Sequence, residues 1–348
     1  MASFEISRVY LVQTLQDLIE TPSPTGDTDW VTGFVQQELE SLGVTASKTI
    51  KGAIVGTFDG LRKDKPRALT AHVDTLGAMV SDIKRNGRLK LTALNGVNWP
   101  ATESEGVTIQ SGSGRQFRGS IVLANGGTHV NKEARTSPRN EDTLEVRIDE
   151  RTSSAEETRM LGIEVGDFVY FDPRFERIES GFISSRFLDD KACVACLLAA
   201  IKAMKETQVS PVQETYMLFS NYEEVLHGGR DGLPENLHEL VVLDMACVGE
   251  NQKGDELHCS VCVKDSHGPY SKHLTDKLRD VARSASIDLI PDVYPYYASD
   301  GSMYWESGGQ AQVALIGPGV DTSHGYERTH EEALMDTASL IAEYMISD

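Results

Sequence analysis

The sequence predicts an α/β fold that is interrupted by an inserted small β-domain, a barrel or a sandwich. Helix-like and strand-like segments alternate at both ends of the 348-residue chain, as they do in α/β proteins. Between these ends, residues 77–183 contain short alternating runs separated by glycines, which is typical of a small all-β domain. Neither flank alone supplies a complete sheet. We therefore predict one discontinuous α/β domain, residues 1–76 and 184–348, with the inserted domain between its two parts.

The N-terminal flank begins with two predicted helices. Residues 6–20 and 28–42 carry apolar residues at helical spacing, and the segment TPSPTG that separates them breaks a helix. Two strand-like runs follow, and the second, RALTAHVDTLG, has the continuous apolar character of a strand buried on both faces. His72 and Asp74 are therefore expected near the end of a core strand.

The inserted segment shows one helical pattern, SSAEETRMLG, among short strand-like runs. The strand-like runs are GRLKLTAL, GVTIQ, GSIVLA, TLEVRI and DFVYF. After this segment α/β alternation resumes with a helix from Lys191, and it ends with a C-terminal helix. The segments between these two helices include TYMLFSNYE, LVVLDMACVGE, the helical TDKLRDVARSA and QAQVALIG.

Charge and composition exclude several classes of protein. The net charge of -20 disfavours nucleic acid and anionic membranes, which attract cationic surfaces. The first twenty residues lack the apolar core of a secretory signal, and no run approaches the roughly 20 apolar residues of a membrane helix. We expect a cytoplasmic protein. The odd count of five cysteines argues against a disulfide framework, and Cys193 and Cys196 are expected to pack on one helix face.

Acidic and histidine side chains follow several predicted strands. The crevice beyond the carboxyl ends of the strands is where open α/β sheets bind ligands. The segments that place such side chains there are AHVD, FLDDK, NYEE and VVLDMA, and SHGYERTHEEA adds two histidines before the last helix. The candidate residues are His72, Asp74, Asp189, Asp190, Glu223, Glu224, Asp244, His324 and His330.

These residues suit a site for two divalent ions. Three carboxylates and a bridging hydroxide balance four positive charges, so that the buried cluster is neutral. Position and charge support His72, Glu224 and Asp244 as ligands, with Glu223 free to accept a proton from bound water. Asp74 is placed to hydrogen-bond the second imidazole nitrogen. Spacing does not choose between Asp189 and Asp190, or between His324 and His330, and any one carboxylate alone is more often a solvated surface group.

At these residues the sequence resembles the TET-type glutamyl and deblocking aminopeptidases, a family often labelled cellulase M or endoglucanase M. The resemblance extends over essentially the whole chain. The H-x-D element of the family is similar to residues 72–74, although Thr75 replaces the usual glutamate. Its L-D-D-R element resembles residues 188–191, and its E-E-V-G element resembles residues 223–225, with departures at residues 226–227.

The resemblance implies a zinc-exopeptidase-like mixed sheet sandwiched by helices, an inserted β-barrel used for dimerisation, and dimers that assemble into a dodecamer. It implies a metal-dependent aminopeptidase that acts on peptides with a free N-terminus. Two divalent ions are expected, Zn or Co, with Mn as a further option. By resemblance one ion is held by His72, Asp189 and Asp244, the other by Asp189, Glu224 and His330, and Glu223 is the catalytic base assisted by Asp74.

Three alternatives remain at this point. A related two-metal amide hydrolase, such as a carboxypeptidase or an N-deacylase, would share the ligands. A glycosidase normally uses two carboxyl groups and needs no metal pair, whereas here the carboxylates come with histidines. A non-catalytic oligomeric scaffold would be expected to have lost at least one core residue. The preferred N-terminal residue is not indicated, and the segment YYASDGSMYW is a candidate for its pocket.

Overall fold

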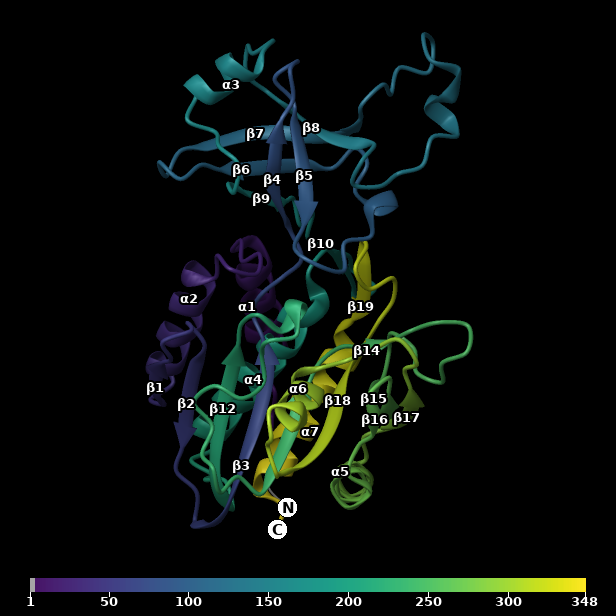
Figure 1. Ribbon diagram of the computed structural model, residues 1–348. Helices are drawn as coiled ribbons and strands as arrows, with labels where there is room; N and C mark the ends of the chain where they lie inside the picture. The colour runs from purple at the N-terminus through teal and green to yellow at the C-terminus, as the bar shows by residue number, and fades with distance from the viewer. Residues whose placement is uncertain (1–3) are drawn as a thin grey trace. The chain divides into compact units, whose positions relative to one another are not determined.

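The computed structural model describes residues 4–348, which form two compact units (Figure 1). Unit 1 contains the chain up to Thr75 and the segment Arg174–Asp348, and unit 2 is Leu76–Pro173. The second boundary precedes the expected residue 184 because β11 (Phe182–Ser185) pairs with β19 (Glu327–His330) of unit 1. The short strand β10 (Glu176–Arg177) pairs with β11 and stays with the same unit.

Unit 1 is built on a ten-stranded mixed sheet with the order β1-β2-β12-β3-β13-β18-β15-β16, in which β14 and β17 pair with β18 and β15. The four central strands, β12, β3, β13 and β18, are parallel neighbours. The outer strands β2 and β15 pair with this group in the antiparallel direction. The strands are β1 (Thr45–Lys48), β2 (Ile54–Phe58), β3 (Arg62–His72), β12 (Gln213–Ser220), β13 (Glu239–Leu243), β14 (Ala246–Cys247), β15 (Cys259–Asp265), β16 (Gly268–Pro269), β17 (Ile290–Val293) and β18 (Gln312–Val320).

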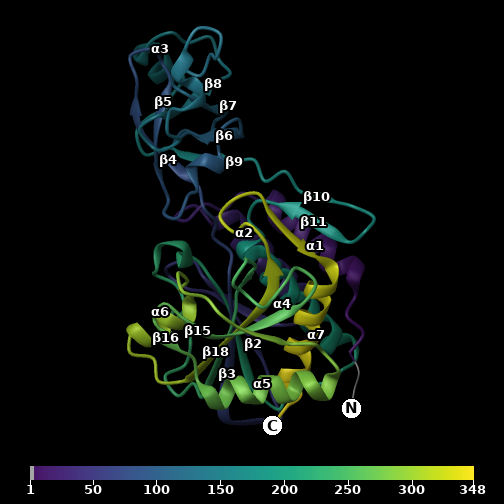
Figure 2. The same cartoon turned by 90° about the vertical axis from the view of Figure 1, so that its right-hand side faces the viewer.

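Helices cover both faces of this sheet, as Figure 2 shows for α1, α4 and α7 on one side and α6 on the other. Alternate residues of the strands enter different cores, because successive side chains of a strand point to opposite faces. Leu69 and Val241 pack with the first group of helices, whereas Ala68 and Val242 pack on the other face. The helices are α1 (Arg8–Glu20), α2 (Asp29–Ser41), α4 (Leu188–Glu206), α5 (Lys272–Ala285), α6 (Asp300–Glu306) and α7 (Glu331–Ile346).

The helix α4 is the most deeply buried of these elements and leads directly from the candidate site. Its apolar sequence has no polar face, so almost every residue from Leu188 to Met204 is buried. Cys193 and Cys196 are fully buried free thiols within it, which agrees with the expected core packing. Within residues 4–348, none of the helices combines the length and the apolar character that a membrane crossing requires.

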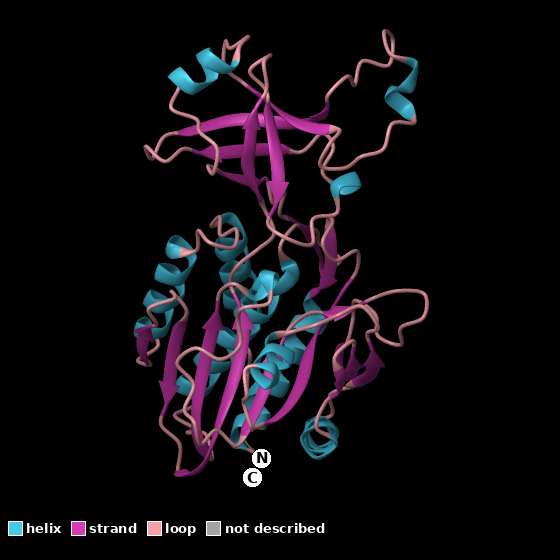
Figure 3. Ribbon diagram, viewed as in Figure 1, coloured by secondary structure: helices cyan, strands magenta, loops and turns pink. Residues whose placement is uncertain are grey.

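Unit 2 is a closed barrel with the strand order β4-β5-β8-β7-β6-β9 (Figure 3). Its strands alternate inward and outward side chains; in β6, for example, Val107 and Ile109 are fully buried. The elements are β4 (Ala78–Ile83), β5 (Leu89–Ala93), β6 (Gly106–Gln110), β7 (Gln116–Leu123), β8 (Leu144–Ile148), β9 (Phe168–Phe171), α3 (Ala155–Met160) and the 3-10 turns Trp99–Ala101 and Lys132–Arg135. The mixed sheet between helices and the inserted barrel confirm the predicted fold class.

Candidate metal centre

The candidate site lies where the parallel strands of unit 1 end. In β3 and β12, His72 and Ser220 are paired at the carboxyl ends of their strands, and β13 ends at Leu243, immediately before Asp244. The 3-10 turn Glu223–Val225 follows β12. Because parallel strands share one carboxyl edge, side chains from segments far apart in sequence converge at this edge, as ligand sites of α/β sheets do.

The imidazole of His72 is fixed by its backbone surroundings. Its Nδ1 lies 2.9 Å from the carbonyl oxygen of Asp74, which accepts a hydrogen bond and therefore places the proton on Nδ1. The other nitrogen, Nε2, lies 3.1 Å from Oδ1 of Asp189 and 3.6 Å from Oε2 of Glu223. Burial lowers the pKa of His72, but the neighbouring carboxylates, Glu223 first, outweigh burial and raise it well above its ordinary value.

Asp74 positions the two glutamates more than the imidazole. Its carboxylate accepts the backbone N–H groups of Glu223 at 3.1 Å and Glu224 at 3.3 Å, and the hydroxyl of Thr25 at 2.6 Å. Its nearer oxygen is 3.6 Å from Nδ1 of His72, beyond a normal hydrogen bond. Nδ1 of His72 therefore donates to the backbone carbonyl of Asp74 and not, as expected, to its carboxylate. The carboxylate points instead toward the 3-10 turn Glu223–Val225.

The carboxylates around His72 are crowded and buried. Asp190 is fully buried, Asp244 is 3% exposed, and Asp189, Glu223 and Glu224 are each 7% exposed. Burial and the charge of Asp189 raise the pKa of Asp244 to about 8, and burial with neighbouring acids raises those of Glu223 and Glu224 well above the ordinary value. Like charges this close are costly to bury unless cations balance them. Oxygen and imidazole donors of this kind suit divalent metal ions, so the residues fit the expected metals.

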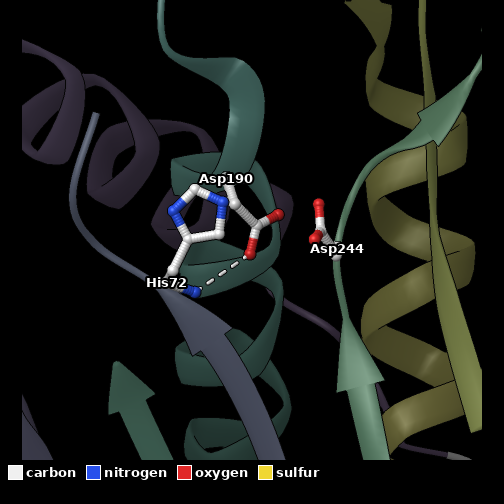
Figure 4. Close-up of side chains that lie close together, drawn as sticks. All are labelled: His72, Asp190 and Asp244. Atoms are coloured by element: carbon white, nitrogen blue, oxygen red, sulfur yellow. Dashed lines mark hydrogen bonds between the residues drawn. The ribbon is translucent and has the colours of Figure 1, made fainter. Parts of the chain in front are cut away.

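Two groups of donors are close enough to share an ion. The donor atoms of His72, Asp190 and Asp244 lie within 4.8 Å of one another, and so do those of His72, Asp189 and Glu224. Figure 4 shows the first group, in which the carboxylates of Asp190 and Asp244 face each other and the backbone N–H of His72 donates to Asp190 at 3.2 Å. Asp190, which the resemblance set aside in favour of Asp189, therefore lies in the cluster as well.

The structure brings His324, and not His330, to this cluster. Nε2 of His324 lies 3.6 Å from Oδ2 of Asp189 and 3.7 Å from Oε2 of Glu224. The side chain of His324 is 35% exposed, at the open side of the buried carboxylates. Asp189 thus directs one carboxylate oxygen to His72 and the other to His324, and His324 and His72 lower the pKa of Asp189 against the effect of burial.

His330 has a different role, which corrects the choice made by resemblance. Its Nε2 lies 2.8 Å from the carbonyl oxygen of Ser180, and its Nδ1 accepts the backbone N–H of Glu332 at 3.1 Å, capping α7. The antiparallel register of β11 and β19 explains the difference. It pairs Glu327 with Ser185, near the start of α4, and His330 with Phe182 at the other end.

Three residues near the cluster were not identified from the sequence. Glu327 accepts the backbone N–H groups of Leu188 and His324. Burial and the charge of Asp189 raise the pKa of Glu327 to about 8. The hydroxyl of Tyr297 donates to the carbonyl of Met245 at 3.2 Å. Asp300 accepts the hydroxyls of Thr70 and Ser220. Their segments had been noted, but hydrophobic periodicity carries no signal for a polar side chain at the start of a short strand or helix, as for Glu327 and Asp300, or in a loop, as for Tyr297.

The chain is similar to one protein family along most of its length. The family model of the M42 glutamyl aminopeptidases matches residues 52–340. The protein "Putative aminopeptidase YhfE" of Bacillus subtilis (strain 168) is 41% identical over 336 residues, which cover 97% of each chain.

Solved structures share the fold at low sequence identity. A TET aminopeptidase from the marine sediment archaeon Thaumarchaeota archaeon gives a TM-score of 0.86 at 19% identity and covers 96% of each chain. The TET1 peptidase of Pyrococcus horikoshii gives 0.85 at 18% identity and covers 97% of this chain and 100% of its own. These likenesses show the fold, and the sequence matches show the relationship. The chain therefore belongs to the M42 glutamyl aminopeptidases, a family of peptide hydrolases.

Proposed function

We propose that this peptide hydrolase is a metal-dependent aminopeptidase, which removes N-terminal residues from peptides with two divalent ions in the described cluster. The proposed ligands are His72, Asp189, Glu224, Asp244 and His324. One observation carries the proposal. The carboxylate of Asp189 has one oxygen 3.1 Å from the imidazole of His72 and the other 3.6 Å from that of His324, as a group shared by two ions would.

The first ion would be held by His72, Asp189 and Asp244. The proton on Nδ1 of His72 is engaged by a carbonyl, so Nε2 is the ring nitrogen that would bind a cation after losing its own proton. Asp190 also lies near Asp244, but one of its oxygens already accepts the backbone N–H of His72. We therefore assign the shared ligand to Asp189, and to Asp190 the task of holding the end of β3.

The second ion would be held by Asp189, Glu224 and His324. Nε2 of His324 is nearly equidistant from the two carboxylates, at 3.6 Å and 3.7 Å. All proposed ligands are nitrogen or oxygen donors without a thiolate, which suits Zn, Co or Mn. The ions would polarise the scissile carbonyl and lower the pKa of the attacking water.

Glu223 is proposed as the general base. Its carboxylate is buried beside His72, and its backbone is held by the Asp74 carboxylate, so the side chain has a fixed approach to the site. It accepts the proton of the attacking water and returns it to the leaving amine. Asp74 does not touch the reacting atoms in this scheme; it orients Glu223 and Glu224 through their N–H groups.

We also propose a homo-oligomer, in which unit 2 forms dimers that assemble into a dodecamer. The support comes from relatives of the same fold: the TET1 peptidase of Pyrococcus horikoshii assembles into a tetrahedron or a large octahedral shell. The cytoplasmic location and the absence of nucleic-acid and membrane partners stay predictions from the sequence.

The test is metal removal followed by separate reconstitution. The protein is treated with a chelator, its metal content is measured, and Zn, Co or Mn is added back during assays with aminoacyl chromogenic substrates. We expect activity to be lost with the metal, to return with two ions per chain, and to require a free N-terminus. Full activity in the chelated protein would refute the proposal.

The same assay separates the rivals. Cleavage of N-acetylated peptides in preference to free ones would identify an N-deacylase, and release of the C-terminal residue would identify a carboxypeptidase. Hydrolysis of glucans by metal-free protein would favour the glycosidase, which needs no metal pair. A protein that binds two ions and cleaves none of these substrates would be a scaffold.

A further inference from the structure

Glu327 connects the two chain segments that supply Asp189 and His324. Its Oε2 accepts the backbone N–H groups of Leu188 at 2.6 Å and Asp189 at 3.3 Å. Its Oε1 accepts the backbone N–H of His324 at 3.1 Å. The carboxyl group therefore uses one oxygen for each segment, and each bond joins a side-chain oxygen to a backbone N–H donor.

The surroundings hold this carboxylate in place. Glu327 is 2% exposed, and its backbone is paired with Ser185 in the β11–β19 ladder. A second link runs parallel to it, because Nη1 of Arg186 donates to the carbonyl of Gly325 at 3.2 Å. Segments 185–189 and 324–327 are thus linked by strand pairing, by the Arg186 guanidinium and by the Glu327 side chain. Of these links, the hydrogen bonds of Glu327 lie nearest to the proposed metal ligands.

The position of His324 depends on such links more than the positions of the other proposed ligands do. His72, Asp189, Glu224 and Asp244 are buried, whereas the His324 side chain is 35% exposed and its backbone has a positive φ of 62° in a loop. Without an anchor, a loop of this kind samples many conformations, and ordering it on metal binding would reduce the binding free energy.

We propose that Glu327 is a positioning residue that fixes His324 relative to Asp189 and thereby sets the affinity of the second ion site. The inference rests on the proposed function, because it assumes the ligand set Asp189, Glu224 and His324. Glu327 itself binds neither ion. It acts through the backbone N–H groups that it accepts, as partners of metal ligands commonly do.

Glutamine at position 327 tests this role with little change of shape. Its amide offers one acceptor oxygen and one NH₂ donor group, so it can serve only one of the two segments. The NH₂ group would face the backbone N–H of the other segment, and two donors form no hydrogen bond with each other. The oxygen is expected to keep the shorter contact, to Leu188 at 2.6 Å, which leaves the His324 loop without its anchor.

The chain offers a matched control in Glu331→Gln. Glu331 is also 2% exposed and lies four residues further along the same segment, but its carboxylate is paired with Arg8 and Arg177. Its replacement makes the same side-chain change at an equally buried glutamate without touching the segments that carry Asp189 and His324. It also perturbs the chain next to His330, so it tests whether that histidine affects the ions.

The experiment is a titration of apo-protein with Co(II), followed by its visible spectrum and by metal content, for the wild type and both variants. We expect the wild type and Glu331→Gln to bind two ions. In Glu327→Gln the second ion should bind about 10- to 100-fold more weakly, with the first ion unchanged and activity restored at high Co(II). Unchanged affinity for both ions in Glu327→Gln would overturn the inference, and so would equal weakening of both.

A double-mutant cycle with His324→Ala separates positioning from general loss of stability. If Glu327 acts through His324, the second change should weaken the second ion no further in the His324→Ala background, so the two effects are not additive. Additive losses would overturn the inference. Should Glu327→Gln fail to fold, Glu327→Asp, which keeps the charge but shortens the reach, is expected to give the same selective weakening, and normal binding would count against the role. A wild type that binds fewer than two ions would refute the proposed function instead.

Discussion

Replacing His324 by alanine is expected to weaken binding of the second ion strongly without unfolding the protein. The imidazole contributes Nε2 at 3.6 Å from Asp189 and 3.7 Å from Glu224, and its side chain is 35% exposed, so little packing is lost with it. Changes to residues that merely support a metal ligand weaken binding about 10- to 100-fold. Loss of the ligand itself should therefore weaken the second ion by at least about 100-fold, or about 2.7 kcal/mol.

The matched change His330→Ala should lower the stability of the protein and leave metal binding unchanged. It removes the cap of α7 and the hydrogen bond to Ser180, each worth about 1 kcal/mol, and the edge-to-face contact with Phe182, worth up to about 1 kcal/mol more. The sum of about 2 to 3 kcal/mol should lower Tm by roughly 4 to 6 °C for a unit of this size. Metal content and activity at low temperature should stay near those of the wild type.

Metal content, Co(II) titration and thermal unfolding of both variants decide between these profiles. The reasoning is refuted if His330→Ala loses one ion while His324→Ala keeps both, because the histidine chosen by resemblance would then be the ligand. Loss of one ion in both variants would also contradict it, since the ring nitrogens of His330 are engaged by Ser180 and Glu332.

Three further expectations concern other parts of unit 1. Glu223→Gln should keep both ions and lower kcat by about 100- to 10,000-fold; near-normal turnover would contradict the assignment of the base. Tyr297→Phe, which loses the hydrogen bond to the Met245 carbonyl next to Asp244, should weaken the first ion measurably in a metal titration, whereas Tyr296→Phe, at a side chain 99% exposed, should behave as the wild type. Glu239→Gln removes the ion-pair partner of the buried Arg67 and should lower the free energy of unfolding by about 3 to 5 kcal/mol. Burial raises the pKa of Glu239, but Arg67, Lys277 and Tyr344 together outweigh burial and lower the pKa. The stability difference between wild type and variant should therefore be full above the unfolded pKa and vanish as pH falls through the lower folded value; a pH-independent difference in urea unfolding would be inconsistent with this.

Hydrophobic patterning was sufficient to predict the α/β class and the inserted β-domain, whereas the sheet sandwiched by helices was implied by the resemblance. The apolar run around Leu69 identified β3 as a strand buried on both faces, and it lies at the centre of the sheet. The unbroken apolar sequence after Lys191 identified α4. The boundary of the inserted unit was harder to locate, because β11 belongs to unit 1 only through its pairing with β19, about 145 residues later in the chain.

The candidate site was predictable where the proposed ligands follow core strands directly, and less so elsewhere. His72 and Asp244 lie at strand ends, so the strands alone bring them to one edge. Choosing between His324 and His330 requires the register of β11 against β19, which depends on contacts far apart in sequence. The turn of the Asp74 carboxylate toward the glutamates is likewise a tertiary effect, since neighbouring residues do not determine it.

The position of β3 in the sheet has a consequence for synthesis of the chain. Both of its neighbours, β12 and β13, lie after the inserted unit, so a strand whose last seven residues are buried in the folded protein stays unpaired until β12, which ends at Ser220, has left the ribosome. At 5 to 20 residues per second this interval is about 10 to 30 s. We expect ribosome-bound chains that end in unit 2 to bind chaperones through residues 66–72 and to be cut there by protease, and protection at that stage would contradict this order of assembly.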